Sequence, residues 1–178
     1  IIQGRCDSPV TKYGLDQAHA AGRALRKRGV HFGDFWCSPS GRAKTTLETV
    51  MLELGIFGDA VHYQCDEDLL EASCGDLEGK SRAYSRSTQG GGDDYYALHG
   101  GENIAEAGVR CGKALARIME KTEAAQTLVV GHNIAMRKFL VTVENPHHVE
   151  VSAAGNCETF VLSYRNGTFT LEDRIPIA

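Results

Sequence analysis

The chain has 178 residues, of which 42% are apolar and 24% charged, as expected for one globular domain with its own core. Its net charge of −4 gives no electrostatic basis for binding nucleic acid or an anionic membrane surface, so we expect neither as a partner. No apolar run is long enough to span a bilayer, and we expect no secretory segment at the start.

The cysteines argue against metal and disulfide frameworks. The six of them are widely and irregularly spaced, at positions 6, 37, 65, 74, 111 and 157. None forms a C-x-x-C pair, so zinc-site spacing is absent. A chain of this length does not need disulfides, so we expect reduced cysteines and a cytoplasmic protein.

The first third of the chain predicts helix, strand and helix. Thr11 is a suitable N-cap for a helix over residues 13–28, and Gly29 is a natural residue to end it. The short apolar run 32–37 predicts a strand that stops at Ser38-Pro39. Apolar residues at helical spacing then predict a second helix that ends at Gly55.

The remainder continues the alternation of helices and strands. Residues 75–101 are rich in Gly, Ser and Asp and predict a long surface excursion, and a third helix follows over residues 103–121. The run 127–131 is typical of a buried parallel strand and leads into a short helix after His132. Asn166-Gly167 between two β-rich runs predicts a hairpin. This order predicts an α/β fold, a three-layer α/β/α sandwich with a mostly parallel central sheet.

The first candidate site is the junction Ser38-Pro39-Ser40-Gly41-Arg42, between a strand end and a helix start. Free N–H groups and the positive helix end favour phosphate there, and Arg42 could grip two phosphate oxygens. Taken alone, the junction equally fits an ordinary helix start with a solvated arginine, because Ser-Pro before a helix is common.

The second candidate is His132, at the end of a buried strand where open α/β sheets place their ligands, with the flexible Gly131 before it. A core histidine bonded to a carbonyl explains it equally well.

The third candidate is the segment 69–79, in which Glu71 and Glu78 lie among apolar residues and glycines. A carboxyl group in such surroundings can have a raised pKa and act as a general acid. The alternative is a loop with ordinary surface acids.

Two further groups have simpler explanations. His147-His148 has no carboxylate or cysteine at ligand spacing, so exposed loop histidines are the better interpretation. Asp93-Asp94 is interpreted as a solvated pair of loop charges.

Taken together and in order, these segments resemble the histidine phosphatase superfamily, which includes the phosphoglycerate mutases. The resemblance covers nearly the whole chain and rests on five motifs that fit the family's patterns: residues 3–14 (QGRCDSPVTKYG), 38–46 (SPSGRAKTT), 69–79 (LLEASCGDLEG), 101–103 (GEN) and 129–133 (VVGHN). Any one of these motifs would be weak, whereas five in order are specific.

The chain departs from the family pattern at two places. The family's Arg-His-Gly signature, which carries the nucleophilic histidine, is absent, and the chain begins abruptly at Ile1 without Met. We therefore expect residues 1–178 to be one histidine-phosphatase domain, truncated at its N-terminus, with the nucleophile upstream of Ile1. Asn133 stands where the family usually has Gly, and Asn tolerates a positive φ better than most residues.

The resemblance implies a phosphatase that hydrolyses a phosphomonoester through a phosphohistidine, with no metal and no cofactor. Arg42 and His132 would bind the phosphate group of the substrate, and a phosphate or sulfate ion could occupy the same pocket. Glu71 would be the general acid and base. The phosphate-binding set expected from the matched motifs is completed by Gln3, Gly4 and Asn133.

Two alternatives to a phosphatase remain open. One is a cofactor-dependent phosphoglycerate mutase, and the other is a non-catalytic phosphate-binding or scaffold relative. The segment after Glu71 favours the phosphatase, because the basic and aromatic residues of the mutases are replaced by Ala72, Ser73 and Cys74, and Glu78 follows the phosphatase pattern. The identity of the small phosphorylated substrate does not follow from these residues.

Overall fold

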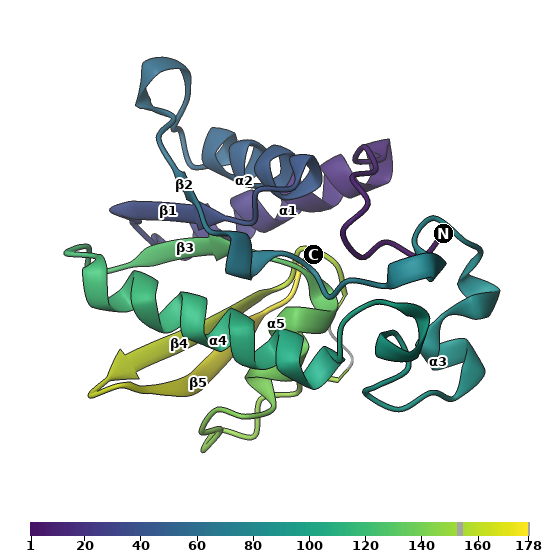
Figure 1. The fold of residues 1–178 in the computed structure, drawn as a ribbon. Helices are drawn as coiled ribbons and strands as arrows, with labels where there is room; N and C mark the ends of the chain where they lie inside the picture. The colour runs from purple at the N-terminus through teal and green to yellow at the C-terminus, as the bar shows by residue number, and fades with distance from the viewer. Residues whose placement is uncertain (153–154, 178) are drawn as a thin grey trace.

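The computed structural model describes residues 1–152 and 155–177. Helices and strands alternate along most of the chain (Figure 1). In chain order they are α1 (Lys12–Lys27), β1 (Asp34–Cys37), α2 (Gly41–Glu53), β2 (Gln64–Cys65), α3 (Arg86–Gln89), α4 (Ile104–Lys121), β3 (Thr127–Val130), α5 (Asn133–Leu140), β4 (Thr159–Arg165) and β5 (Thr168–Ile175).

The described strands form two separate sheets. Strands β2, β1 and β3 make a parallel sheet in that order, with Cys37 paired to Cys65 on one side and to Val130 on the other. Strands β4 and β5 make an antiparallel hairpin. Its turn residues Asn166 and Gly167 have φ values of 51° and 80°, which a type I′ hairpin turn requires.

The layers follow from the two faces of β1. Phe35 and Cys37 pack into one apolar cluster with α1 and α2, whereas Trp36 packs into another with α4 and α5. Alternate side chains of a strand point to opposite faces, so the parallel sheet lies between two layers of helices (Figure 1). The predicted α/β sandwich with a parallel sheet is confirmed, and the hairpin is a separate antiparallel addition to it.

The helix boundaries are set by capping residues, of which Thr11 and Gly29 were expected from the sequence. The Thr11 side chain accepts a hydrogen bond of 3.1 Å from the Gly14 N–H at the start of α1. Asn103 does the same for α4, accepting from the Ala105 N–H at 2.9 Å. Gly29 follows α1 with a φ of 66°, which a residue without a Cβ adopts at no steric cost.

Two features differ from the sequence-based expectations. Strand β2 was not predicted, because it has only two residues and both are exposed. Asp93 is not a solvated loop charge: both of its carboxylate oxygens lie 2.6 Å from Nζ of Lys138 on α5. This ion pair ties the 75–101 excursion to the body of the domain, since oppositely charged groups at this distance attract strongly.

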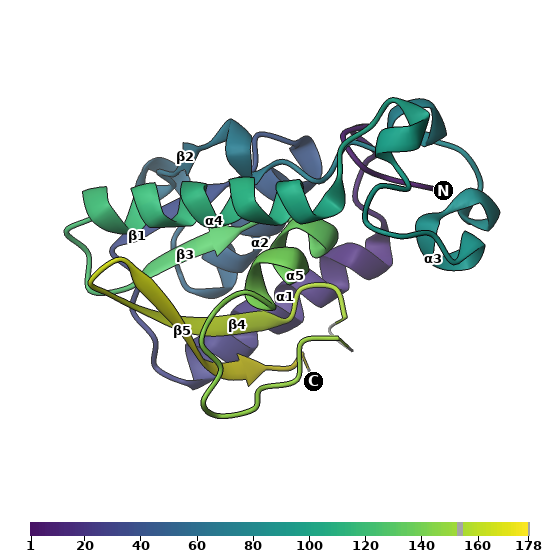
Figure 2. The same ribbon diagram turned by 60° about the horizontal axis from the view of Figure 1, so that its bottom comes forward.

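The excursion itself is folded into short helical turns. It includes α3 and packs around Tyr96, which is buried. Both views show α3 and its neighbouring turns at one end of the molecule, on the same side as the N-terminus (Figures 1 and 2). In the described part of the chain, no helix combines the length and hydropathy needed to cross a membrane.

Candidate active site

The ends of β1 and β3 bring Ser38 and His132 together. Ser38 directly follows Cys37, and His132 comes two residues after Val130, to which Cys37 is paired in the parallel sheet. Nε2 of His132 lies 2.8 Å from Oγ of Ser38 and 3.3 Å from Oγ of Ser40. Both serines are buried. The carboxyl ends of two neighbouring strands therefore form one polar site, as parallel sheets generally do.

His132 is electrically neutral near pH 7. Burial lowers the pKa of its imidazole to about 3, and the positive charge of Arg42 acts in the same direction. A neutral ring has one N–H donor and one acceptor nitrogen. In this state His132 can offer a hydrogen bond to an oxyanion but brings no positive charge of its own.

Glu71 is held at the start of α5, with only 4% of its surface exposed. One carboxylate oxygen accepts the N–H groups of Ala72 and Ala135, and the other accepts that of Ile134, each at 2.9 Å. Burial raises the pKa of this carboxyl group, although the three N–H donors lower it in part. Glu71 can therefore hold a proton at a higher pH than an exposed glutamate while its anion still has hydrogen-bond partners.

Arg42 connects this site to the N-terminal segment. Its Nη1 and Nη2 atoms donate hydrogen bonds of 2.6 Å to the carbonyl oxygens of Cys6 and Gly4. Its charge also lowers the pKa values of both Glu71 and His132. One cation thus acts on both titratable groups, which come from distant parts of the chain.

The start of α2 is not an open anion site in this structure. The Gly41 N–H donates to Oδ2 of Asp7 at 3.1 Å, and the Ser40 N–H points to Oγ of Ser38 at 3.4 Å. The Gly41 N–H, one of the groups expected to be free, is therefore taken by a carboxylate of the same chain, an anion that the helix N-terminus favours.

The other expected phosphate-binding residues differ in burial. Gly4 is buried, and a Cβ there would lie 2.3 Å from Oε1 of Glu78, so only glycine fits. Gln3 and Asn133 are exposed. Asn133 begins α5 and is not among the residues with positive φ, so a tolerance of left-handed backbone is not needed there.

Glu78 has a structural role that the sequence did not reveal. Its carboxylate accepts the N–H groups of Gly4, Arg5, Cys6 and Cys74 at 2.8–3.1 Å. Burial acts to raise the pKa of Glu78, but these hydrogen bonds outweigh it and the pKa is lowered. Glu78 is therefore ionised at neutral pH and fixes the N-terminal segment beside Glu71, because a carboxylate that accepts several N–H groups strongly favours its charged form.

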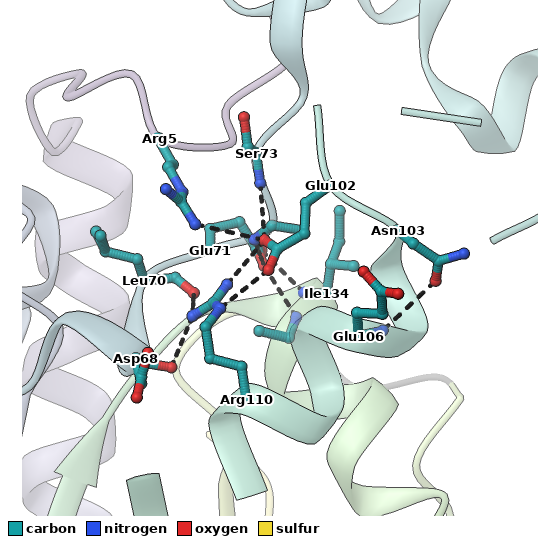
Figure 3. A network of polar contacts seen from close by, with 12 residues as sticks. Arg5, Asp68, Leu70, Glu71, Ser73, Glu102, Asn103, Glu106, Arg110 and Ile134 are labelled. Atoms are coloured by element: carbon teal, nitrogen blue, oxygen red, sulfur yellow. Dashed lines mark hydrogen bonds and ion pairs between the residues drawn. The ribbon is translucent and has the colours of Figure 1, made fainter. Parts of the chain in front are cut away.

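Arg110 and Glu102 support the loop that carries Glu71, and neither belonged to an expected site (Figure 3). Arg110 donates to the carbonyl oxygens of Asp68 and Leu70 and forms two hydrogen bonds to Glu102. Glu102 in turn accepts the Ser73 N–H. The motif Gly101-Glu102-Asn103 was the available signal, but its loop contacts depend on tertiary packing.

The remaining candidates lie elsewhere. His147 is exposed and lies 3.1 Å from a carboxylate oxygen of Glu172. Within the described ranges, no cluster of three or more His, Cys, Asp or Glu side chains has the arrangement of a metal site.

A neutral histidine, a buried glutamate and an arginine at the strand ends of a parallel sheet define an α/β protein of the phosphoglycerate-mutase-like class. Residues 1–174 match the sequence profile of the histidine phosphatase superfamily, branch 1. The chain belongs to this superfamily.

A protein of Salmonella paratyphi B named probable phosphoglycerate mutase is 32% identical over 149 residues, covering 80% of this chain and 66% of that protein. The chain thus spans just under two thirds of the curated relatives it matches.

Two solved structures show the same fold. A phosphoglycerate mutase from Bacillus anthracis is 20% identical, with a TM-score of 0.77 over 96% of this chain and 83% of that chain. A mycobacterial glucosyl-3-phosphoglycerate phosphatase is also 20% identical, with a TM-score of 0.72 over 99% of this chain and 91% of that chain. That phosphatase has been solved with inorganic phosphate as well.

Proposed function

We propose that this protein is a phosphatase that hydrolyses a small phosphomonoester through a phosphohistidine intermediate. The observation that carries the proposal is that the Glu71 carboxylate is bound by the N–H groups of Ile134 and Ala135, just after His132, which itself contacts Ser38. The charge of Arg42 acts on both Glu71 and His132. Such a site combines a cation, a neutral hydrogen-bond donor and a carboxyl group able to hold a proton. Phosphoryl transfer depends mainly on positioning and charge stabilisation, which these three groups can provide.

Each residue has a distinct role in the proposed reaction. Arg42 and His132 bind the phosphate oxygens, assisted by the exposed Gln3 and Asn133 and by the backbone at the buried Gly4. A nucleophilic histidine attacks phosphorus, and protonated Glu71 gives its proton to the leaving oxygen. Ionised Glu71 then takes a proton from the water that hydrolyses the phosphohistidine. The raised pKa of Glu71 supports its role in the first step.

The nucleophile is proposed to come from a strand that precedes Ile1. Among the described strands, β3 has a partner on one edge only, and β4 pairs only with β5. In Figure 1, β4 is the hairpin strand nearer to β3. A strand inserted between them would pair with both edges and end beside His132, because unpaired edges are ready templates for another strand.

A phosphoglycerate mutase is the second candidate. Its support is the name of the 32% identical Salmonella relative. The phosphatase is preferred because Ala72 and Cys74, next to Glu71, are small and buried and so provide no basic or aromatic group for a phosphoglycerate.

We propose the cytoplasm as the compartment of this protein, since all six cysteines are free thiols.

The test compares the protein extended by its natural upstream residues with residues 1–178 alone. The extended protein should cleave an aryl phosphate in the presence of EDTA and should not interconvert 2- and 3-phosphoglycerate. Residues 1–178 should bind phosphate without turnover. Turnover by residues 1–178 that is lost in His132→Ala would show that the nucleophile is misassigned, and a requirement for a divalent metal would indicate a different chemistry.

Phosphate binding by residues 1–178 tests the role of Arg42 separately. Arg42→Ala should weaken binding by about 1.5–3 kcal/mol, the range for a hydrogen bond to a charged group. Lys44→Ala, on the same helix, is the matched control and should change binding little. Equal losses of phosphate affinity in both variants would show that only the total positive charge matters, not a specific contact by Arg42. Circular dichroism must show that the folds are retained, because Arg42 also holds Gly4 and Cys6.

A further inference from the structure

Cys37 and Cys65 face each other across two neighbouring strands. They are paired in register in the parallel ladder between β1 and β2, and their Sγ atoms are 3.7 Å apart. Among the described cysteines, this is the only pair whose sulfur atoms are in hydrogen-bonding contact. The proposed phosphatase chemistry uses neither thiol.

The backbone geometry permits a covalent bond between these sulfurs. Neighbouring strands lie about 4.7–4.9 Å apart, and the Cα atoms of disulfide-bonded cysteines are usually about 4.4–6.8 Å apart. Only the sulfur atoms have to approach, to about 2.05 Å. Side-chain rotation can supply that movement, because paired residues in register project from the same face of the sheet.

The two thiols differ in access to solvent. Cys65 is exposed, whereas Cys37 is fully buried beneath α2. Burial, reinforced by the hydrogen bond to Cys65, raises the pKa of the Cys37 thiol to about 12. An oxidant in solution therefore meets Cys65 first, and Cys37 is the protonated partner held beside it.

We propose that Cys37 and Cys65 are a modification site at which peroxides or small-molecule disulfides form a reversible intramolecular disulfide. With hydrogen peroxide, the Cys65 thiolate attacks one oxygen, the O–O bond breaks, and a sulfenic acid and water result after proton transfer. Cys37 sulfur then attacks the Cys65 sulfur, its proton passes to the leaving hydroxide, and a second water is released. The two thiols lose two electrons, and the peroxide gains them.

This disulfide would join the end of β1, which leads into the candidate active site, to the end of β2. Cys37 immediately precedes Ser38, which bonds to His132. Cys65 immediately precedes Asp66, whose N–H donates to the Cys37 carbonyl oxygen at 3.2 Å, and the chain then continues to Glu71. The modification does not depend on phosphatase activity and can be tested without it.

The test uses residues 1–178 in their native state, freed of reductant and exposed to hydrogen peroxide or oxidised glutathione. After acid quenching and denaturation, maleimide labels the remaining thiols, and mass spectrometry counts them and maps any linked peptides. Two of the six thiols should be lost to labelling, through a Cys37–Cys65 link that dithiothreitol reverses. Oxidation in denaturant should scramble the pairing, since the register of the strands is then lost.

Two variants decide between this pair and other thiols. Cys65→Ser, at an exposed position, should abolish the link and leave Cys37 available to maleimide after denaturation. Cys6→Ser removes another partly exposed cysteine and should leave the link unchanged. The proposal is overturned if native Cys65 only accumulates glutathione or higher oxides without linking to Cys37, or if other pairs form as readily.

Discussion

At the scale of single residues, Glu71 balances two opposing effects. Burial favours its neutral form, whereas three backbone N–H donors, two of them at the start of α5, favour its anion. A general acid that later acts as a base needs both forms to be accessible. The environment of Glu71 provides this balance with backbone groups that cannot move away when the proton leaves.

Replacing Glu71 with Gln should therefore abolish most of the activity of the upstream-extended protein. The amide cannot exchange a proton, so aryl phosphate turnover should fall by roughly 10²–10⁴-fold, the usual contribution of general acid–base catalysis. The exposed Glu67→Gln in the same loop is the control and should keep near-normal turnover. Unchanged rates in Glu71→Gln would assign the proton transfer to another group.

His132 should make the fold sensitive to acid. Its pKa is lowered from 6.5 to about 3, so the unfolded chain binds more protons between these values, and stability falls as pH drops below 6.5. At pH 5 the loss should be at most about 2 kcal/mol relative to pH 6.5, at 1.36 kcal/mol for each pH unit.

Urea unfolding of wild type and His132→Gln at pH 7 and pH 5 checks this prediction. The variant should lose less stability between the two pH values, whereas His62→Gln, at an exposed position, should behave like wild type. The difference between proteins is the relevant quantity, because Glu71 acts in the opposite direction: its raised pKa gives stability below pH 4.5 that is lost as pH rises. Equal acid sensitivity in wild type and His132→Gln would contradict a buried neutral imidazole.

At the scale of elements, α4 holds the loop before Glu71 with two arginines in different surroundings. The Arg110 side chain is 16% exposed and bonds to Glu102 and to two loop carbonyl oxygens. The Arg117 side chain is 42% exposed and pairs with Asp66 and Asp68. Exposed ion pairs contribute little because water solvates the separated charges, whereas buried partners left alone are costly.

Arg110→Met should thus destabilise the fold much more than Arg117→Met. We expect a loss of about 1.5–3 kcal/mol for Arg110, the range for hydrogen bonds to charged groups, and under about 1 kcal/mol for Arg117. Urea midpoints with unchanged slopes measure both. In the upstream-extended protein, Arg110→Met should also shift the pH dependence of turnover, because the loop that positions Glu71 is released. Equal stability losses would show that the difference in solvent exposure does not make the Arg110 contacts stronger than those of Arg117.

At the scale of the whole molecule, β3 and β4 each have one unpaired edge among the described strands, as do β2 and β5. The helices, by contrast, bury their apolar faces in two continuous clusters on either side of the parallel sheet. The proposed upstream strand would join the parallel sheet to the hairpin in one central layer. That strand would carry the proposed nucleophile and would also pair with both edges.

The extended protein should accordingly melt at a higher temperature than residues 1–178. For a domain of this size each kcal/mol of stabilisation raises Tm by about 2–4 °C, so a newly paired strand should add several degrees. Replacing the upstream histidine with Ala should remove turnover and retain the higher Tm. Thermal unfolding followed by circular dichroism measures the shift. No change in Tm would mean that the upstream segment does not pair with these edges.

The hairpin, the helices α1, α2, α4 and α5, and the order of the site segments could be predicted from the sequence. Thr11, Asn103 and Asn166-Gly167 act through local hydrogen bonds and backbone conformations, which depend only on neighbouring residues. The position of His132 after an apolar strand was equally visible, because the ends of parallel strands carry ligand sites. The resemblance to the histidine phosphatases followed from the order of motifs.

How these residues act on one another depends on the tertiary structure. In the folded chain, Asp7 accepts an N–H at the start of α2, and Glu78 accepts N–H groups of the N-terminal segment. Arg110 donates to a carbonyl oxygen of the loop before Glu71. The tertiary structure also pairs the two-residue strand β2 with β1, which brings Cys65 against Cys37. These contacts join residues far apart in the chain, so their energies depend on burial and distance, which local patterns do not encode.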